Sequence, residues 1–289
     1  MEWHWHAHLV YLQLLSPMHI GWQRAGNLQQ TRPYLPAWNL WGALTARLAR
    51  QANIATEDQA GYKKMGELVE ENLRFTYFYP TMYFGNDAFD ADKMLWPWDD
   101  QERFSWLFFA SQASTALSAA GTAEEGSLHD VEFIAPFTRA GDQVGLVGYV
   151  FSKPDFQLDW QSVLRQGLQL GGERTYGWGR VRAEGPFTEL TINEPWVICF
   201  GLKVELNVPE APIITLKQHT GVLLAHTPVK GVTDFEGPIE RMVRRDTKDS
   251  RFFGRDIKVY IPCWTPGSKS CLQADFGING QGVWYQYTR

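Results

Sequence analysis

Residues 2–15, EWHWHAHLVYLQLL, alternate along an extended chain and are the first clear structural signal of the sequence. One side of such a strand carries Trp3, Trp5, Leu9 and Tyr11, and the other carries His4, His6, His8, Val10, Leu12 and Leu14. Both sides are rich in apolar and aromatic groups, so the pattern predicts a buried first strand. Ser16, Pro17 and Gly21 then end it.

The next segments predict two helices. In residues 34–50, YLPAWNLWGALTARLAR, Asn39 is a candidate N-cap and leucines recur at helical spacing, with two arginines in the last turn. Thr56 and Gln59 have the spacing of a capping box, which predicts a second helix over roughly 57–73. The start of the chain therefore combines a strand with helices.

The rest of the chain predicts mostly strands. The expected elements are, in order, a strand over 75–84 that Pro80 bends or places at an edge, an exposed acidic insertion near 85–103, a helical segment at 110–120, strands near 130–137 and 144–151, a helix that begins after Asp159 and ends at Gly171 and Gly172, and strands within 195–206, 221–229, 257–264 and 282–288. Pro186, followed by the turn-forming residues 193–195, marks a boundary between domains at 1–187 and 188–289.

Composition limits the class of protein. The chain has 289 residues, 44% of them hydrophobic and 20% charged, which suits one large or two ordinary folded domains. It lacks a long apolar run and a signal peptide, so we expect a cytoplasmic protein with no membrane partner. Its three cysteines, Cys199, Cys263 and Cys271, form no CxxC pair, which argues against a disulfide framework or a zinc knuckle.

The charge and the aromatic content bear on nucleic-acid binding. A formal net charge of −5 disfavours non-specific binding to nucleic acid, so any such site must be local. The 13 Trp, 17 Phe and 11 Tyr residues suit a core, a partner interface or a platform for base stacking, and composition does not choose among these.

Residues 171–180, GGERTYGWGR, are the strongest candidate site. The glycines Gly171, Gly172, Gly177 and Gly179 permit close approach of a backbone, and exposed amides together with Arg174 and Arg180 suit phosphate oxygens. Tyr176 and Trp178 could stack on bases. A dinucleotide loop is excluded because the glycines follow an expected helix and precede a strand, and no Walker lysine is present. The alternative is a helix C-cap feeding an edge strand, with the tryptophan in the core.

Three motifs in this order resemble the RAMP superfamily of CRISPR-associated proteins: LLSPMHIG at 14–21, YLPAWNLWGALTARL at 34–48 and LGGERTYGWGRV at 170–181. The resemblance implies an α+β, ferredoxin-like fold of the RNA-recognition type over 1–187, with a β-rich C-terminal half for which a second, degenerate copy is one alternative. The glycine segment most resembles that of the type III effector subunits that hold the 5′ handle of the guide RNA.

The implied function is a non-catalytic RNA-binding subunit of a type III CRISPR effector ribonucleoprotein, with guide RNA and other subunits as partners and no cofactor or metal. In this hypothesis Arg174 and Arg180 clamp phosphates while Tyr176 and Trp178 stack. The further RNA-binding candidates are His19, Arg24, Asn39 and, in the basic run 241–258, Arg244, Arg245 and Arg251. A solvated loop of paired charges is the alternative for that run.

The sequence departs from the family's pattern in two places. The family's helix start favours small hydroxyl and basic residues, whereas this chain has Ala37, Trp38, Asn39 and Trp41. Residues 21–36 contain no Asp or Glu, which argues against a subunit that cuts target RNA.

Two other functions stay open. A metal-independent guide-processing endoribonuclease would use His19 as a general base on a 2′-hydroxyl, although the same histidine could simply hydrogen-bond the strand end. A purely structural bridging subunit would bind partners and no RNA. His4, His6 and His8 share one side of the first strand, but a metal site normally draws ligands from more than one element.

Overall fold

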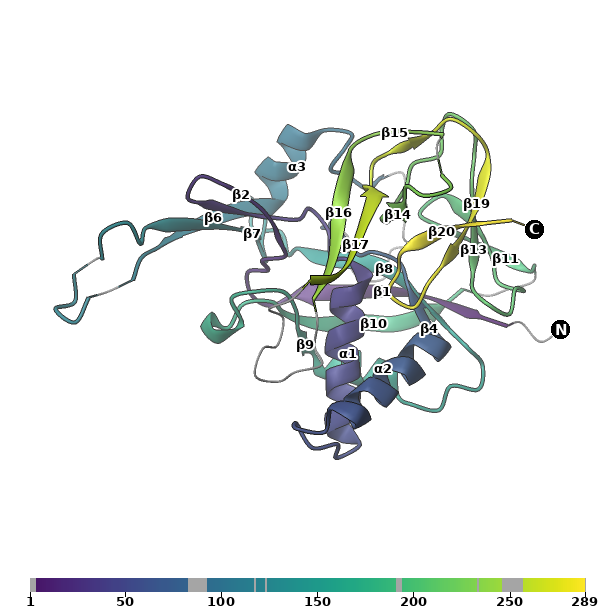
Figure 1. The fold of residues 1–289 in the computed structure, drawn as a ribbon, viewed down its shortest axis with the longest axis horizontal. Helices are drawn as coiled ribbons and strands as arrows, with labels where there is room; N and C mark the ends of the chain where they lie inside the picture. Colours follow the sequence, from purple (N-terminus) through teal and green to yellow (C-terminus); the bar gives the residue numbers. More distant parts are fainter. Residues whose placement is uncertain are drawn as a thin grey trace.

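A computed structural model describes residues 4–82, 93–116, 118–122, 124–190, 194–232, 234–245 and 257–288, with the side chains of 186, 188, 244, 245 and 257–260 left aside. The fold is mixed α+β and is dominated by strands, as the sequence predicts for its class (Figure 1). Within the described residues no helix is long and apolar enough to cross a membrane.

The central sheet is built around the first strand. β1 (His6–Leu14) pairs antiparallel with β8 (Gly145–Ser152) on one side and with β10 (Arg180–Glu189) on the other. β4 (Leu73–Phe75) and β5 (Tyr79–Thr81) pair with β8, and β9 (Leu168–Gln169) pairs with β10. The strand order is therefore β4-β8-β1-β10-β9. β8 is buried throughout and most of β1 is buried, which confirms the buried first strand.

Helices connect these strands. In the sequence, α1 (Ala37–Gln51) and α2 (Gln59–Asn72) come between β1 and β4, and α4 (Trp160–Gln166) comes between β8 and β10. In space, α1 and α2 lie side by side (Figure 1). The Asp159 carboxylate caps α4 by accepting from the amide of Ser162, as expected.

The expected caps of the first two helices were wrong. α1 begins directly after Pro36, so Asn39 lies inside the helix; proline is extended here and has no amide to leave unsatisfied at a helix start. α2 is capped by the carboxylate of Asp58, which accepts from the amide of Gly61, because a single turn at 56–57 precedes the helix. Each observed N-cap thus lies two or three positions from the residue that the sequence pattern indicated: Pro36 instead of Asn39, and Asp58 instead of Thr56.

A second sheet projects away from the central one (Figure 1). It contains β2 (Gly21–Ala25), β3 (Leu28–Thr31), β7 (His129–Ile134) and β6 (Phe109–Ser114), in the order β2-β3-β7-β6, and α3 (Gln101–Phe108) leads directly into β6. The helix expected at 110–120 was wrong, since residues 109–114 pair with β7 along their whole length. Ladder pairing with β7 here overrides the helical preference of alanine.

The C-terminal half is β-rich, as expected. Its five-stranded sheet has the order β11 (Trp196–Cys199), β12 (Leu202–Glu205), β13 (Ile213–Leu216), β19 (Ala274–Ile278) and β20 (Trp284–Tyr287). Two smaller sheets contain β14 (Thr227–Pro228), β17 (Ile257–Trp264) and β16 (Ile239–Arg245), and β15 (Phe235–Glu236) with β18 (Lys269–Ser270). Within 221–229, where one longer strand was expected, only Thr227 and Pro228 lie in a strand.

The two halves share one hydrophobic core. The Trp96 and Trp98 rings stack with centroids 5.2 Å apart, and Phe200 of the C-terminal half meets Trp96 at 5.5 Å. The Tyr79 hydroxyl donates to the carbonyl of Leu224 at 2.7 Å. The sequence predicted an exposed acidic insertion near 85–103, and this was wrong at Trp96 and Trp98, whose rings pack against the core. Positions 83–92 of the expected insertion lie outside the described residues. β10 also continues past position 187, pairing Glu189 with His8.

Candidate nucleic-acid interface

The glycine segment forms the loop of a hairpin. α4 ends at Gln166, Gly167 follows with φ 97°, and β9 then leads into residues 171–179, after which β10 returns antiparallel to β9. The expected helix end at Gly171 and Gly172 was therefore wrong, because Gly167 takes the positive φ that ends α4. The tip of this hairpin, residues 174–176, is exposed.

Two of the glycines are required by close backbone approach. Gly171 and Gly179 have φ of 80° and 78°, and a Cβ on Gly171 would lie 2.3 Å from the carbonyl oxygen of His19. The amide of Gly172 donates to the carbonyl of His19 at 2.8 Å, and the amide of Gly179 donates to the carbonyl of Pro17 at 2.7 Å. The glycine loop therefore packs directly on the turn at 16–21, and the first and third sequence motifs form one structural unit.

Most amides of the loop donate inside the protein. The amides of Tyr176 and Trp178 donate to the carbonyl of Glu173, and that of Gly177 donates to the carbonyl of Arg174. The amide of Arg180 donates to Oγ of Ser16 at 2.9 Å. These donors shape the loop, so the groups that face outward are chiefly its side chains.

The two aromatic residues of the loop differ in exposure. Tyr176 ends a short 3₁₀ turn, Arg174–Tyr176, and is 78% exposed. The ring of Trp178 meets Phe133 of β7 at 4.8 Å and 66°, so it connects the loop to the projecting sheet. The Tyr176 ring is therefore free of the core, whereas Trp178 holds the loop against the projecting sheet.

A cleft of about 300 Å³ lies between the glycine loop, the end of α4 and α1. Its charged lining consists of Arg47 and Arg50 from α1, Arg174 from the loop and Arg180 at the start of β10, and no described lining residue is acidic. We call it the arginine cleft. The Nε of Arg174 donates to the carbonyl of Gly171 and Nη2 of Arg47 donates to Oε1 of Gln166, which orients both side chains. Four arginines with no described carboxylate among them give the cleft the chemistry that anions favour.

Sequence reasoning did not identify Arg47 and Arg50 as site residues. It treated them as basic residues of a last turn, where they favour the helix dipole. The overlooked signal is the face formed by Ala43, Ala46, Arg47 and Arg50, whose helical spacing puts small and basic side chains together. The alanines leave room for a ligand beside the guanidinium groups.

The other candidates lie outside the arginine cleft. His19 is 6% exposed, and its Nδ1 donates to the carbonyl of Glu132 at 2.7 Å. Arg24 is exposed on β2 and its Nε donates to the carbonyl of Gly26. Asn39 is partly buried in α1, and its Oδ1 accepts no hydrogen bond from the described residues. Only the backbone of Arg244 and Arg245 is described, in β16, and Arg251 lies outside the described residues.

Two of the three N-terminal histidines, His6 and His8, take separate partners. Nδ1 of His6 lies 2.9 Å from a carboxylate oxygen of Glu189, while Nε2 of His8 lies 3.1 Å from Oγ of Ser152. Burial, the largest effect on His8, lowers the pKa of its imidazole. Among the residues described, no group of three or more His, Cys, Asp or Glu side chains is arranged to bind a metal ion.

Comparisons with known proteins give a distant structural likeness. No family model matches the sequence, and no curated protein matches it. A chain of the cryo-EM structure of the Type III-B Cmr-beta bound to cognate target RNA and AMPPnP is similar at a TM-score of 0.49 and 11% identity, covering 91% of this chain and 85% of that one. A chain of the same assembly bound to cognate target RNA gives 0.48 and 11%, covering 91% and 86%. A chain of its apo state gives 0.35 and 12%, covering 62% and 96%.

Proposed function

We propose that the chain is an RNA-binding subunit of a type III CRISPR effector ribonucleoprotein, that it holds the guide RNA without cutting it, and that it docks neighbouring subunits. One observation carries the proposal: Arg174 and Arg180 of the glycine loop and Arg47 and Arg50 of α1 line a single cleft without a carboxylate among its described residues. Each of the three motifs that resemble the RAMP superfamily contributes residues to the lining of this cleft, among them Leu15, Arg47 and Arg174.

The element order supports a ferredoxin-like first domain. The order β1, α1 with α2, β4, β8, α4 and β10 follows the β-α-β-β-α-β pattern of that fold. β1 lies in the middle of the sheet, with β8 and β10 beside it. Because β1 and β10 are antiparallel neighbours, the turn after β1 and the loop before β10 meet at the same end of the sheet, and the cleft forms there. We keep 1–187 as this domain and 188–289 as the β-rich second part.

The cleft binds RNA through phosphates. Guanidinium groups donate two parallel hydrogen bonds to phosphate oxygens and keep their charge at any physiological pH. The exposed ring of Tyr176, two residues along the loop from Arg174, offers a surface for one base, a contact that tolerates any sequence. Because the net charge of the chain is −5, binding is confined to this local positive site.

The test is binding of RNA by the purified chain and by matched charge variants. We expect Arg174→Glu to weaken binding of a repeat-derived RNA at least tenfold by fluorescence anisotropy, since it places a carboxylate among three guanidinium groups. Lys64→Glu makes the same charge change at an exposed position on α2 outside the cleft, and we expect less than a twofold effect. Equal losses in the two variants would mean that binding follows total charge and that the cleft is not the site.

The type III assignment is tested by copurification. Expressed with its genomic neighbours, the chain is expected to retain a small RNA of defined 5′ end and to crosslink to it at Tyr176. Copurified subunits without RNA would support the structural bridge instead. The absence of cutting is tested separately on a repeat RNA in EDTA, where we expect no cleavage because the His19 ring is buried and its Nδ1 is engaged. Cleavage that disappears in His19→Ala would establish the processing endoribonuclease.

A further inference from the structure

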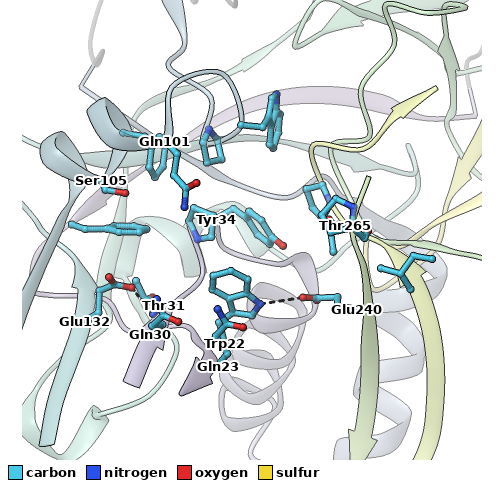
Figure 2. Close-up of a pocket in the computed structure, with 18 residues that line it drawn as sticks. Trp22, Gln23, Gln30, Thr31, Tyr34, Gln101, Ser105, Glu132, Glu240 and Thr265 are labelled. Carbon is cyan, nitrogen blue, oxygen red and sulfur yellow. Dashed lines mark hydrogen bonds between the residues drawn. The ribbon is translucent and has the colours of Figure 1, made fainter. Parts of the chain in front are cut away.

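A second and larger cavity, of about 560 Å³, lies where the projecting sheet meets the C-terminal half. It is walled by β2 and β3, by α3, and by the segments around Pro238 and Thr265 (Figure 2). Its aromatic lining consists of Trp22, Tyr34, Trp98, Phe104 and Phe109. None of these residues belongs to the arginine cleft, so this cavity is an independent feature.

The charged lining of the cavity is acidic. Glu132 and Glu240 line it, and no described lining residue is Lys, Arg or His. Figure 2 shows the two carboxylates on opposite sides, with Trp22 and Tyr34 between them. An anionic ligand is therefore disfavoured, and a nucleotide would bring its phosphate toward two carboxylates.

The charge of Glu240 is already compensated. Its Oε1 lies 2.8 Å from Nη1 of Arg32, and Nε2 of the buried His226 donates to the same oxygen. Its Oε2 accepts from Nε1 of Trp22 at 3.2 Å. Both oxygens of this carboxylate therefore have partners within the protein, and one of them holds the Trp22 ring in place at the cavity.

The charge of Glu132 is not compensated in this way. Its Oε2 accepts one hydrogen bond, from the amide of Thr31 at 3.0 Å, and no described cation forms an ion pair with it. Burial is the largest effect on this carboxyl and raises its pKa, while the hydrogen bond from Thr31 and the nearby His19 act in the opposite direction. The net rise marks a carboxylate that the surroundings leave poorly solvated. An arriving cation would relieve that cost.

We propose that this cavity receives an arginine side chain of a partner protein. A guanidinium is planar, stacks on aromatic faces and donates two hydrogen bonds to one carboxylate, so it matches the rings and Glu132 together. The side chains of Gln30, Gln101 and Ser105 offer further acceptors around the rim. This inference goes beyond RNA binding, because it assigns a protein partner to a surface that the arginine cleft does not share.

The first experiment uses the full chain and two probe peptides. By saturation-transfer NMR and calorimetry we expect acetyl-Gly-Arg-Gly-amide to bind with a dissociation constant in the millimolar range, and the citrulline peptide, which has the same shape without the charge, to bind at least fivefold more weakly. This comparison requires no variant protein, so it does not depend on how any substitution folds. The proposal would be overturned if both peptides bound equally well, or if the arginine peptide showed no binding at 20 mM.

A variant pair locates the site. We expect Glu132→Gln to weaken the arginine peptide at least fivefold, whereas Glu102→Gln, an exposed carboxyl of α3 outside the cavity lining, leaves it within twofold. Arg174→Glu is expected to leave peptide binding unchanged, which separates failure here from failure of RNA binding. Binding of guanosine monophosphate that is lost in Glu132→Gln and is not displaced by the arginine peptide would assign the cavity to a nucleobase and contradict the proposal.

Discussion

The amide of Gly179 donates a hydrogen bond to the carbonyl oxygen of Pro17 at 2.7 Å, and this is one of the bonds that connect the glycine loop to the turn that follows the first strand. The approach is possible because Gly179 has φ of 78° and no side chain: a Cβ there would lie 1.8 Å from the carbonyl oxygen of Leu170. The contact positions Arg180, the next residue, at the arginine cleft. The glycine thus has a structural role that places a functional side chain.

Gly179→Ala is predicted to destabilise the chain by about 3 kcal/mol or more, because the new methyl group must displace the backbone at Leu170 and the residue keeps a positive φ. The free energy of unfolding from urea titration measures this. Gly177→Ala is the matched control: its φ is 82° but nothing lies within 4 Å of the new Cβ. Only the conformational cost of about 1–2 kcal/mol applies there. Equal losses at the two positions would show that Gly179 is not held by close contact.

The salt dependence of RNA affinity is predicted to follow the number of cleft arginines. Each phosphate contact with a single strand contributes about 0.7 to the slope of log K against log salt, so four contacts give a slope near −3 at most. Arg180→Gln is expected to reduce the slope by about 0.7 with the fold unchanged, because this side chain is exposed. Titrations between 50 and 300 mM KCl measure the slope. An unchanged slope would place Arg180 away from the phosphates.

The His226–Glu240–Arg32 cluster is predicted to make stability fall in acid. Burial alone would raise the pKa of the Glu240 carboxyl, but the hydrogen bond and charge of His226 and the charge of Arg32 lower it to about 2. Since the unfolded carboxyl titrates near 4.5, the unfolded chain binds the extra proton first, and the stability present above about pH 5 is lost as the pH falls toward 2. The shift corresponds to about 3 kcal/mol.

His226 adds to this loss at higher pH. Burial, its largest effect, lowers the pKa of the imidazole below the ordinary value of 6.5, so protonation of the unfolded chain begins to cost stability below about pH 6.5. Urea midpoints from pH 7 to pH 3 are expected to fall less steeply in Glu240→Gln than in the wild type. Glu184→Gln, which removes an exposed ion pair with Arg182, is expected to leave the slope as it was. Parallel slopes in all three proteins would contradict the role of Glu240.

The sequence pattern was sufficient for elements whose signal is local. The alternation around Leu12 predicts β1 because both faces of that strand are buried, and Asp159 predicts the start of α4 because its carboxylate meets an amide three residues later. The motif residues at 16–21 and 171–180 are brought together, which their order alone does not require. Here two local motifs marked residues that contact each other although they lie far apart in the sequence, as Pro17 and Gly179 do.

Long-range pairing explains what the sequence reasoning missed. Residues 109–114 have a helical composition, but their backbone groups pair with β7, a choice that only the folded neighbour determines. Trp96 and Trp98 follow acidic residues, yet Tyr79 and Phe200 surround their rings. The cavity at Glu132 and the arginine cleft each draw on three or more segments. The glycine motif therefore indicated only Arg174 and Arg180 of the cleft, and no motif indicated the cavity.

The domain division at 187 lies inside β10, and a cut close after this strand is predicted to leave an unstable first half. A fragment of residues 1–190 loses the groups that satisfy its buried polar side chains: the carbonyl of Val208 for Trp5, Nδ1 of His226 for Tyr77 and the carbonyl of Leu224 for Tyr79. It also exposes the rings of a core that both halves share. We expect an aggregated or dye-binding fragment without sharp near-ultraviolet circular dichroism.

The control for this prediction keeps the chain whole. Tyr79→Phe removes only the hydroxyl that donates to Leu224, and we expect a loss of about 1–2 kcal/mol with a single cooperative transition. One transition in the full chain, together with an unfolded fragment, means that the first half depends on the second for its stability. A soluble 1–190 fragment that unfolds sharply would instead establish two independent domains, because the shared rings would then contribute little to either one.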